Sequence, residues 1–424
     1  MSIAKQSHAF LVGCFNGNLK PQELKDGWVN IKLSEEEYNY RLSMYYKSHV
    51  DAMAEAEGQN RPEFLKDVVH YQYSYQSIKR DVKGLEITIG ESVSVKIKNN
   101  DVFVEYPFEI YNIDLYFFPF EIVLVSIEID DSGSDLNLLT NCHYKLVNWD
   151  SNINAMAGDS FKKCLEPLVE FLPNKDLSAL VKDGNNLKIF QIVQGEECIP
   201  DSERLFEIAT FSPVPSVKKD SENSHSEAYF NKIMSENSVS TFSNWKALAL
   251  VDSFTILGGK DFEKRIWQWV NLYYPLVYLR CIFEKTFCFS RNNTYRLDDQ
   301  QKSVKELSDE ISKMEKYYFY SNFSYNFQPN LVYETMVKGI GLKAEREELS
   351  NQVRERAKEE EEKRRNRITL GLSAFAVFSI AWDLCSLLMK AFTWGDCPWP
   401  ALLLLILSVV VILVLAFYIY RKKK

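Results

Sequence analysis

Six small or polar residues recur along an apolar segment near the end of the chain, and they form its clearest pattern for chemistry. They follow one another at intervals of four, three, three, four and three residues, which places them on one face of a helix. The six are Thr369, Ser373, Ala376, Ser379, Asp383 and Ser386. An aspartate inside a membrane span costs about 2.5–3.5 kcal/mol and usually marks an ion or proton path. The pattern therefore predicts that this face lines a water-filled pore.

A simpler interpretation of the same face remains open. Small residues let helices pack closely, and Asp383 would then bond to a neighbour or lie near enough to the surface to be hydrated. In that case the face serves packing and conducts nothing.

Two apolar segments must position this face. They run over Ile368–Met389 and Ala401–Tyr420, and at about 1.5 Å per residue each is long enough to cross a hydrocarbon layer of about 30 Å. Arginines precede the first segment and a basic tail, 421–424, follows the second, whereas the loop 390–400 carries little charge. Because positive charge stays on the cytosolic side, we expect a multi-pass protein of the inner (cell) membrane with both termini in the cytosol.

The rest of the chain is expected to form a cytosolic part in front of these spans. Residues 1–215 mix strand and helix signals and predict an α/β or α+β domain, and 216–240 look like a polar linker. Residues 241–367 predict a helical stalk region, with helices over Asp261–Phe289 and Gln301–Tyr320 that are rich in aromatic residues. One continuous helix is expected over Leu342–Lys390, because this stretch contains no proline.

Composition and motifs exclude several classes of function. The 424 residues carry a net charge of −8, which argues against direct binding of nucleic acid. Any nucleotide that the chain binds is therefore expected to be a small ligand. Eight scattered cysteines form no CxxC pair, and no GxGxxG, P-loop, HExxH or GxSxG motif occurs. We therefore expect no enzyme, no catalytic residues and no required cofactor.

The order of these parts resembles the CorA family of divalent cation transporters. The likeness covers most of the chain, and the stretch from Met314 to Arg367, with MEKYYFYSNFSYNFQPNLVYETMVKGIGLKAEREEL, also looks like the segment before the membrane in divergent CorA-like proteins. The resemblance implies a symmetric homo-oligomer, commonly a pentamer, in which the first span lines the pore. Mg²⁺ or another cation would be the permeant ion.

One departure from the family changes what the resemblance implies. Family members carry Gly-Met-Asn at the outer mouth of the pore, whereas this loop reads KAFTWGDCPWP, with Gly395 and Asp396 as the nearest analogue. Divergent CorA-like proteins without the motif include those encoded beside type III CRISPR systems. In that group the family implies gating by a nucleotide second messenger, a conjugate of S-adenosylmethionine and AMP, in antiviral defence.

Three functions follow as hypotheses. The first is a cation channel gated from its cytosolic domain, in a form that acts as a CRISPR-linked anti-phage effector. The second is a housekeeping transporter of Mg²⁺ or other divalent cations. The third is a non-conducting, membrane-anchored receptor or scaffold in which the two spans only anchor and oligomerise the soluble domain.

Overall fold

The fold is seen in a computed structural model that describes most of the chain. The described residues are 4–15, 19–34, 53, 55–56, 61–75, 90–99, 102–132, 135–148, 158–175, 187–217, 224–262, 274–297, 304–319, 324, 326–391, 399, 403 and 406. They divide into two compact units, Met1–Leu349 and Ser350–Lys424.

A ten-stranded sheet organises the first unit. Its strands run in the order β2-β3-β5-β6-β1-β7-β10-β9-β8, and β4 pairs with the first half of β5. All neighbours are antiparallel except β7 and β10, which are parallel. The strands are β1 Gln6–Cys14, β2 Trp28–Asn30, β3 Val69–Ser74, β4 Glu91–Asn99, β5 Val102–Phe118, β6 Ile122–Ser132, β7 Lys188–Gln194, β8 Ser238–Val239, β9 Trp245–Ala249 and β10 Ser253–Gly258. The segments SVSVKIK, DVFVEY and EIVLVSIEID, which the sequence predicts as strands, lie in or overlap β4, β5 and β6.

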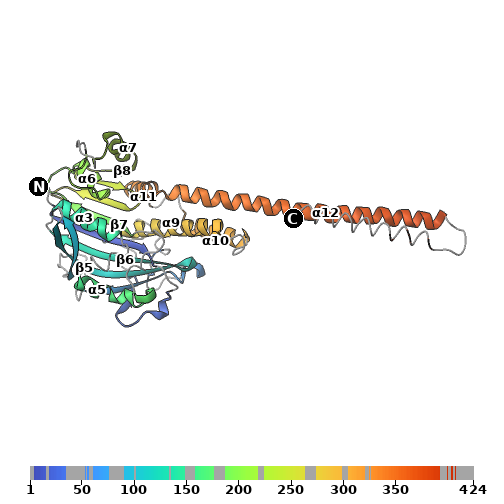
Figure 1. Ribbon diagram of the computed structural model, residues 1–424, viewed down its shortest axis with the longest axis horizontal. Helices are drawn as coiled ribbons and strands as arrows, with labels where there is room; N and C mark the ends of the chain where they lie inside the picture. Colours follow the sequence, from blue (N-terminus) through green and yellow to red (C-terminus); the bar gives the residue numbers. More distant parts are fainter. Residues whose placement is uncertain are drawn as a thin grey trace. The chain divides into compact units, whose positions relative to one another are not determined.

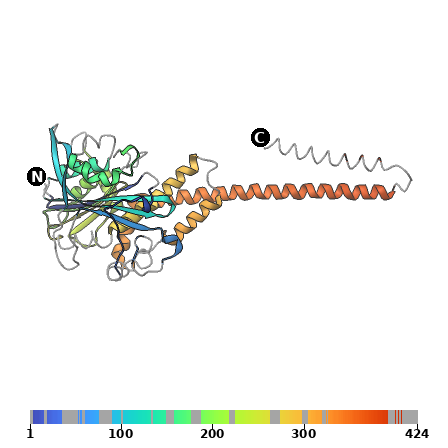
Figure 2. The same cartoon turned by 90° about the horizontal axis from the view of Figure 1, so that it is seen from below.

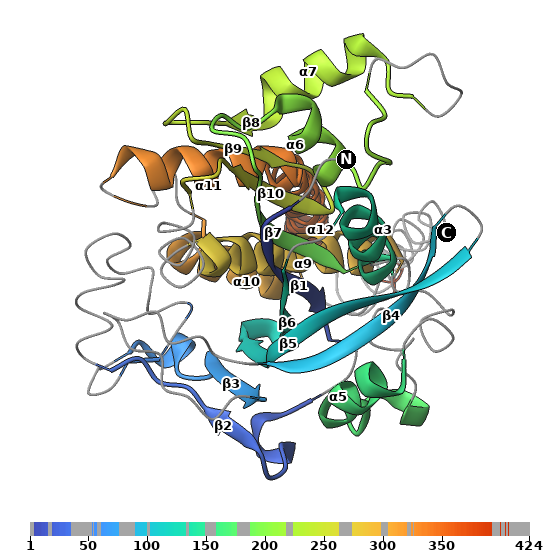
Figure 3. The same ribbon diagram turned by 90° about the vertical axis from the view of Figure 1, so that its left-hand side faces the viewer.

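Helices cover both faces of this sheet (Figures 1 and 3). On one face, α3 (Leu136–Val147), α5 (Asp159–Val169) and α6 (Ser202–Ala209) bury aliphatic side chains of alternate strand positions. On the other, α9 (Tyr274–Leu297) packs on β1 and β6. The segment 216–240 contains α7 (Glu227–Asn237) and β8, and the sheet continues through β9 and β10 beyond it.

Three further helices complete the described chain. They are α10 (Val304–Tyr317), α11 (Phe327–Gly339) and α12 (Leu342–Ala391). Figures 1 and 2 show α12 as one unbroken helix, and its bounds agree with the continuous helix expected from Leu342 to Lys390. Gly341 precedes it with a φ of 72°, a left-handed conformation that glycine adopts without steric cost.

The aromatic side chains of α9 find their partners within this unit. Phe283 stacks on Phe118 at the end of β5, with ring centroids 4.3 Å apart, and Tyr278 packs against Phe190 and Phe254. These contacts explain why a helix so rich in aromatic residues is buried.

The two predicted transmembrane helices are not found, which corrects the fold class given above. Within the described ranges, no helix has both the length and the apolarity needed to cross a membrane. The predicted second span, Ala401–Tyr420, lies outside the described residues apart from Leu403 and Ile406. The expectations of a transmembrane ion channel and of a multi-pass inner-membrane location are contradicted by the same finding.

Candidate functional site

The six residues of the predicted pore face all lie on α12. In the single chain they are exposed or half-exposed, from Thr369 to Ser386, and they take no part in the clusters described below. The predicted outer mouth, Gly395 and Asp396, lies outside the described residues.

A different set of residues combines aromatic rings with cations in the first unit. Four rings meet in a chain: Phe287 lies 4.8 Å from Phe120, Phe120 lies 5.5 Å from Phe64, and Phe64 stacks on Tyr317 at 5.1 Å between centroids. Three cations lie over these rings. Together they form what we call the aromatic–cationic cluster: Phe64, Phe120, Phe287, Tyr317, Arg291, Lys313 and Lys316.

The cluster draws on four separate elements. Phe64 belongs to the short helix Glu63–Leu65, Phe120 to the turn Pro119–Glu121 between β5 and β6, Phe287 to α9 and Tyr317 to α10. Phe287 is fully buried, whereas the other three rings are half-exposed. The inner end of the cluster is therefore packed and its outer end reaches the surface.

The turn that presents Phe120 is strained. Phe120 and Glu121 have φ angles of 66° and 62°, in the left-handed region that residues with a Cβ rarely adopt. Such conformations persist only where the surroundings hold them, and they concentrate at functional sites. Here the rings of Phe64 and Phe287 hold Phe120 from two sides.

The cations of the cluster lie over its aromatic rings. The Arg291 guanidinium lies 5.4 Å from the Phe287 ring and 5.9 Å from the Phe120 ring. Lys313 lies 5.6 Å from the Phe64 ring, and Lys316 lies 5.0 Å from the Tyr317 ring. Both lysines are exposed. Aromatic faces stack with nucleobases and Lys or Arg contact phosphates, so the cluster has the chemistry of a nucleotide site.

One carboxylate pairs with this cationic group. Glu310 of α10 accepts a hydrogen bond from Arg291 Nε at 2.8 Å, and both side chains are mostly buried. Glu310, Lys313 and Tyr317 are spaced three and four residues apart, so they share one face of α10.

A second charged group joins α9 to the first turns of α12. Glu284, fully buried, accepts a hydrogen bond from Arg280 Nε at 2.8 Å and forms a second ion pair with Arg346 of α12. Arg346 also donates to the hydroxyl of Tyr333 of α11 at 3.2 Å. We call Arg280, Glu284, Tyr333 and Arg346 the α12 junction. Burial lowers the pKa of the Arg346 guanidinium to about 10, so it keeps its charge at neutral pH.

The aromatic–cationic cluster and the α12 junction are adjacent on α9. Arg291 belongs to the cluster, and its neighbour Asn292 donates a hydrogen bond to Glu345 of α12 at 3.1 Å. Lys285, between the two groups, donates to the carbonyl of Ile340 just before α12 at 2.5 Å. A change at the cluster therefore has a short path to α12 along one helix.

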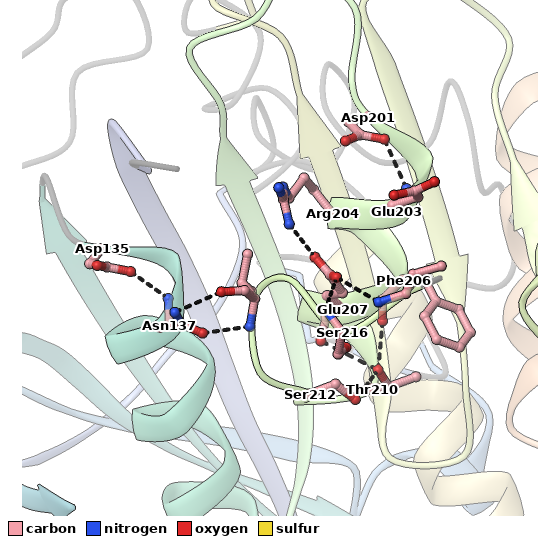
Figure 4. Close-up of polar contacts among 12 residues, drawn as sticks. Asp135, Asn137, Asp201, Glu203, Arg204, Phe206, Glu207, Thr210, Ser212 and Ser216 are labelled. Carbon is pink, nitrogen blue, oxygen red and sulfur yellow. Dashed lines mark hydrogen bonds and ion pairs between the residues drawn. The ribbon is translucent and has the colours of Figure 1, made fainter. Parts of the chain in front are cut away.

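Buried polar groups elsewhere in the unit serve the fold. Figure 4 shows Glu207 of α6, whose carboxylate accepts from Arg204 and from the backbone N–H of Ser216 at 2.5 Å and of Val217 at 3.1 Å. Asn137 of α3 bonds to both backbone groups of Val214 in the same loop. These contacts fix the path of the loop after α6, and every group involved is already paired.

A row of polar residues on the α9 side of the sheet has the same character. His8 pairs with Glu128 at 3.1 Å, Asn112 donates to Glu128 at 2.6 Å, and His70 pairs with Asp114 at 2.7 Å. In the part of the chain that the structure describes, no group of three His, Cys, Asp or Glu could hold a metal ion. The row therefore forms a polar network across the strands.

Sequence reasoning did not find the cluster or the junction. The only signal was the general richness of 261–320 in aromatic residues. Phe64 and Phe120 lie far from that region in the sequence, and no spacing connects them to it.

Comparison with family models, with curated proteins and with solved structures gave no match.

Proposed function

We propose that the chain is a CorA-like, nucleotide-responsive receptor that works as a homo-oligomer. Its first unit would bind a small nucleotide at the aromatic–cationic cluster, and α12 would carry the response. The resemblance makes the conjugate of S-adenosylmethionine and AMP, a signal of antiviral defence, the first ligand to test.

The observation that carries this proposal is the placement of three cations over four aromatic rings at a half-exposed site. Stacking of one base on an aromatic side chain is worth about 1–3 kcal/mol, and phosphate contacts from Lys and Arg add to it. The negative net charge of the whole chain makes such a local group of cations selective for a small anion over a nucleic acid.

The response of α12 is supported by its buried attachment to α9. Glu284 bonds to arginines of both helices, so a shift of α9 changes the ion pair that holds α12. A ligand can move this equilibrium only by as much as its affinity differs between the two arrangements. Contacts of the ligand with Arg291, on the same helix, would make its affinity differ between the two arrangements.

The proposal is tested by titrating the full chain calorimetrically with the conjugate, with ATP and with AMP. We expect Tyr317→Ala to weaken binding of the nucleotide by about tenfold to a hundredfold, because it removes one of the half-exposed rings. Tyr144→Ala is the matched control, since Tyr144 is an exposed aromatic residue of α3 on the opposite face of the sheet. Absence of binding by the unaltered protein, or equal losses in both variants, would refute the proposal.

A second measurement follows the response itself. Hydrogen exchange of the backbone amides in 342–349 should change when the nucleotide binds, because these residues form the first turns of α12 and include Arg346. If hydrogen exchange in 342–349 stays constant at saturating nucleotide, α12 does not respond to binding. Light scattering with and without nucleotide gives the number of chains in the assembly.

A further inference from the structure

The nucleotide site of the proposed function contains its own competing anion. The carboxylate of Glu310 accepts a hydrogen bond from Arg291 Nε at 2.8 Å. The guanidinium of Arg291 lies over two rings of the cluster. Arg291 is the most buried of the three cations, whereas Lys313 and Lys316 are exposed. Any anion that uses the inner part of the site meets Glu310 first.

We infer that Glu310 is an internal stand-in for the ligand's phosphate, and that a phosphate-bearing nucleotide displaces it from Arg291. This inference rests on the proposed function. A guanidinium binds phosphate oxygens with two parallel hydrogen bonds, and a phosphate offers more acceptor oxygens than a carboxylate. An uncharged nucleoside has no group that could replace Glu310, so the site discriminates in favour of the phosphorylated form.

Displacement would loosen one link while leaving others in place. The Arg291–Glu310 pair joins α9 to α10, and α10 is also held by Met314 and Tyr318, both fully buried. Tyr318 packs on Phe283 of α9 with centroids 4.7 Å apart. The helix would therefore stay docked while the Glu310 side chain is released.

The release is coupled to α12 through the next residue of α9. Asn292 follows Arg291 and donates a hydrogen bond to Glu345 of α12. A movement of the Arg291 backbone therefore changes this hydrogen bond to α12. Ligand binding and ordering of α12 are then linked in both directions, as any coupling between two sites requires.

The test compares the affinities of AMP and adenosine for two charge-matched variants of the full chain. Glu310→Gln removes the competing carboxylate, and Asp309→Asn removes one negative charge from the adjacent, exposed position of the same helix. We expect Glu310→Gln to bind AMP about five- to tenfold more tightly and adenosine with unchanged affinity. Asp309→Asn should change AMP affinity by less than about twofold, because its charge is exposed and screened.

The outcomes separate the two proposals. If the unaltered protein binds AMP and the two variants bind it alike, Glu310 is no competitor and the inference is wrong, although the receptor function stands. If neither the unaltered protein nor a variant binds any nucleotide, both proposals fail. Glu310→Asp provides a second measurement if the Glu310→Gln protein does not fold, because its shorter side chain weakens the pair but keeps the charge. The AMP affinity of Glu310→Asp should lie between those of the unaltered protein and Glu310→Gln.

Discussion

The guanidinium of Arg346, in the first turns of α12, forms an ion pair with the carboxylate of Glu284, a fully buried residue of α9. The same carboxylate also binds Arg280, so one negative charge holds two positive ones inside the unit. Arg346 lies 4.4 Å from the Phe319 ring and Arg280 lies 5.7 Å from the Tyr333 ring, so aromatic faces help to offset the excess positive charge. One acidic side chain is therefore the shared partner of Arg280 and Arg346.

Replacing Glu284 should destabilise the first unit strongly. In Glu284→Gln the fully buried Arg280 and the half-buried Arg346 lose their counter-charge. Breaking a buried pair in this way typically costs about 3–5 kcal/mol. The free energy of unfolding is measured with urea and followed by tryptophan fluorescence. Glu347→Gln is the control, since Glu347 pairs with Lys343 at 3.9 Å on an exposed face of α12, and it should cost less than about 0.5 kcal/mol.

A double variant checks the cause of this loss. Glu284→Gln combined with Arg346→Gln removes one charge of each sign, so it should be more stable than Glu284→Gln alone. If the two losses simply add, uncompensated charge is not the cause, and Glu284 contributes by packing.

The strained turn after β5 should tolerate glycine. In Glu121→Gly the steric strain of the left-handed conformation disappears, and this gain offsets the larger backbone entropy that glycine loses on folding. The free energy of unfolding should therefore change by less than about 0.5 kcal/mol. Glu315→Gly, at an exposed position inside α10, should cost about 1 kcal/mol. Equal losses in both variants would mean that Glu121 does not carry the strain.

The loop after α6 should open when Glu207 loses its charge. Glu207→Gln replaces one accepting oxygen by an amide donor, although the carboxylate now accepts from Arg204 and from two backbone N–H groups. An unsatisfied buried group costs about 1–3 kcal/mol, so the amides of Ser216 and Val217 should exchange hydrogen faster by about tenfold or more. Glu197→Gln, at an exposed position, should leave both amides unchanged.

His143 should make stability depend on pH. Burial lowers its pKa from 6.5 to about 4, while its contact with Gln191 at 2.7 Å opposes this shift in part. Between about pH 6.5 and pH 4 the unfolded chain binds a proton that the folded chain excludes, so stability falls as the pH falls and is complete above that window. The loss by pH 4 is on the order of 3 kcal/mol.

The assignment to His143 is checked by unfolding the protein in urea at pH 7.5 and pH 4.5. The difference between the two free energies of unfolding should shrink in His143→Gln, which lacks the titrating ring. A difference of the same size in both proteins would place the pH dependence on other groups.

Local patterns predicted several of the elements. The absence of proline between Leu342 and Lys390 predicted the long helix α12, and alternating β-branched residues predicted strands that became β4, β5 and β6. Such features depend on neighbours within a few residues, and the sequence displays them directly. The same reasoning applied to hydropathy predicted the span over Ile368–Met389, which the described part of α12 does not support.

The candidate site was decided by tertiary structure alone. Phe64, Phe120, Phe287 and Tyr317 come from four elements, and Glu284 meets Arg346 across more than sixty positions of the chain, |i−j| = 62. The sequence by itself determined the local patterns that became β4, β5, β6 and α12. Which ring meets which cation depends on how α9 and α10 pack on the sheet. That packing arises from the burial of many side chains at once, so no local spacing records it.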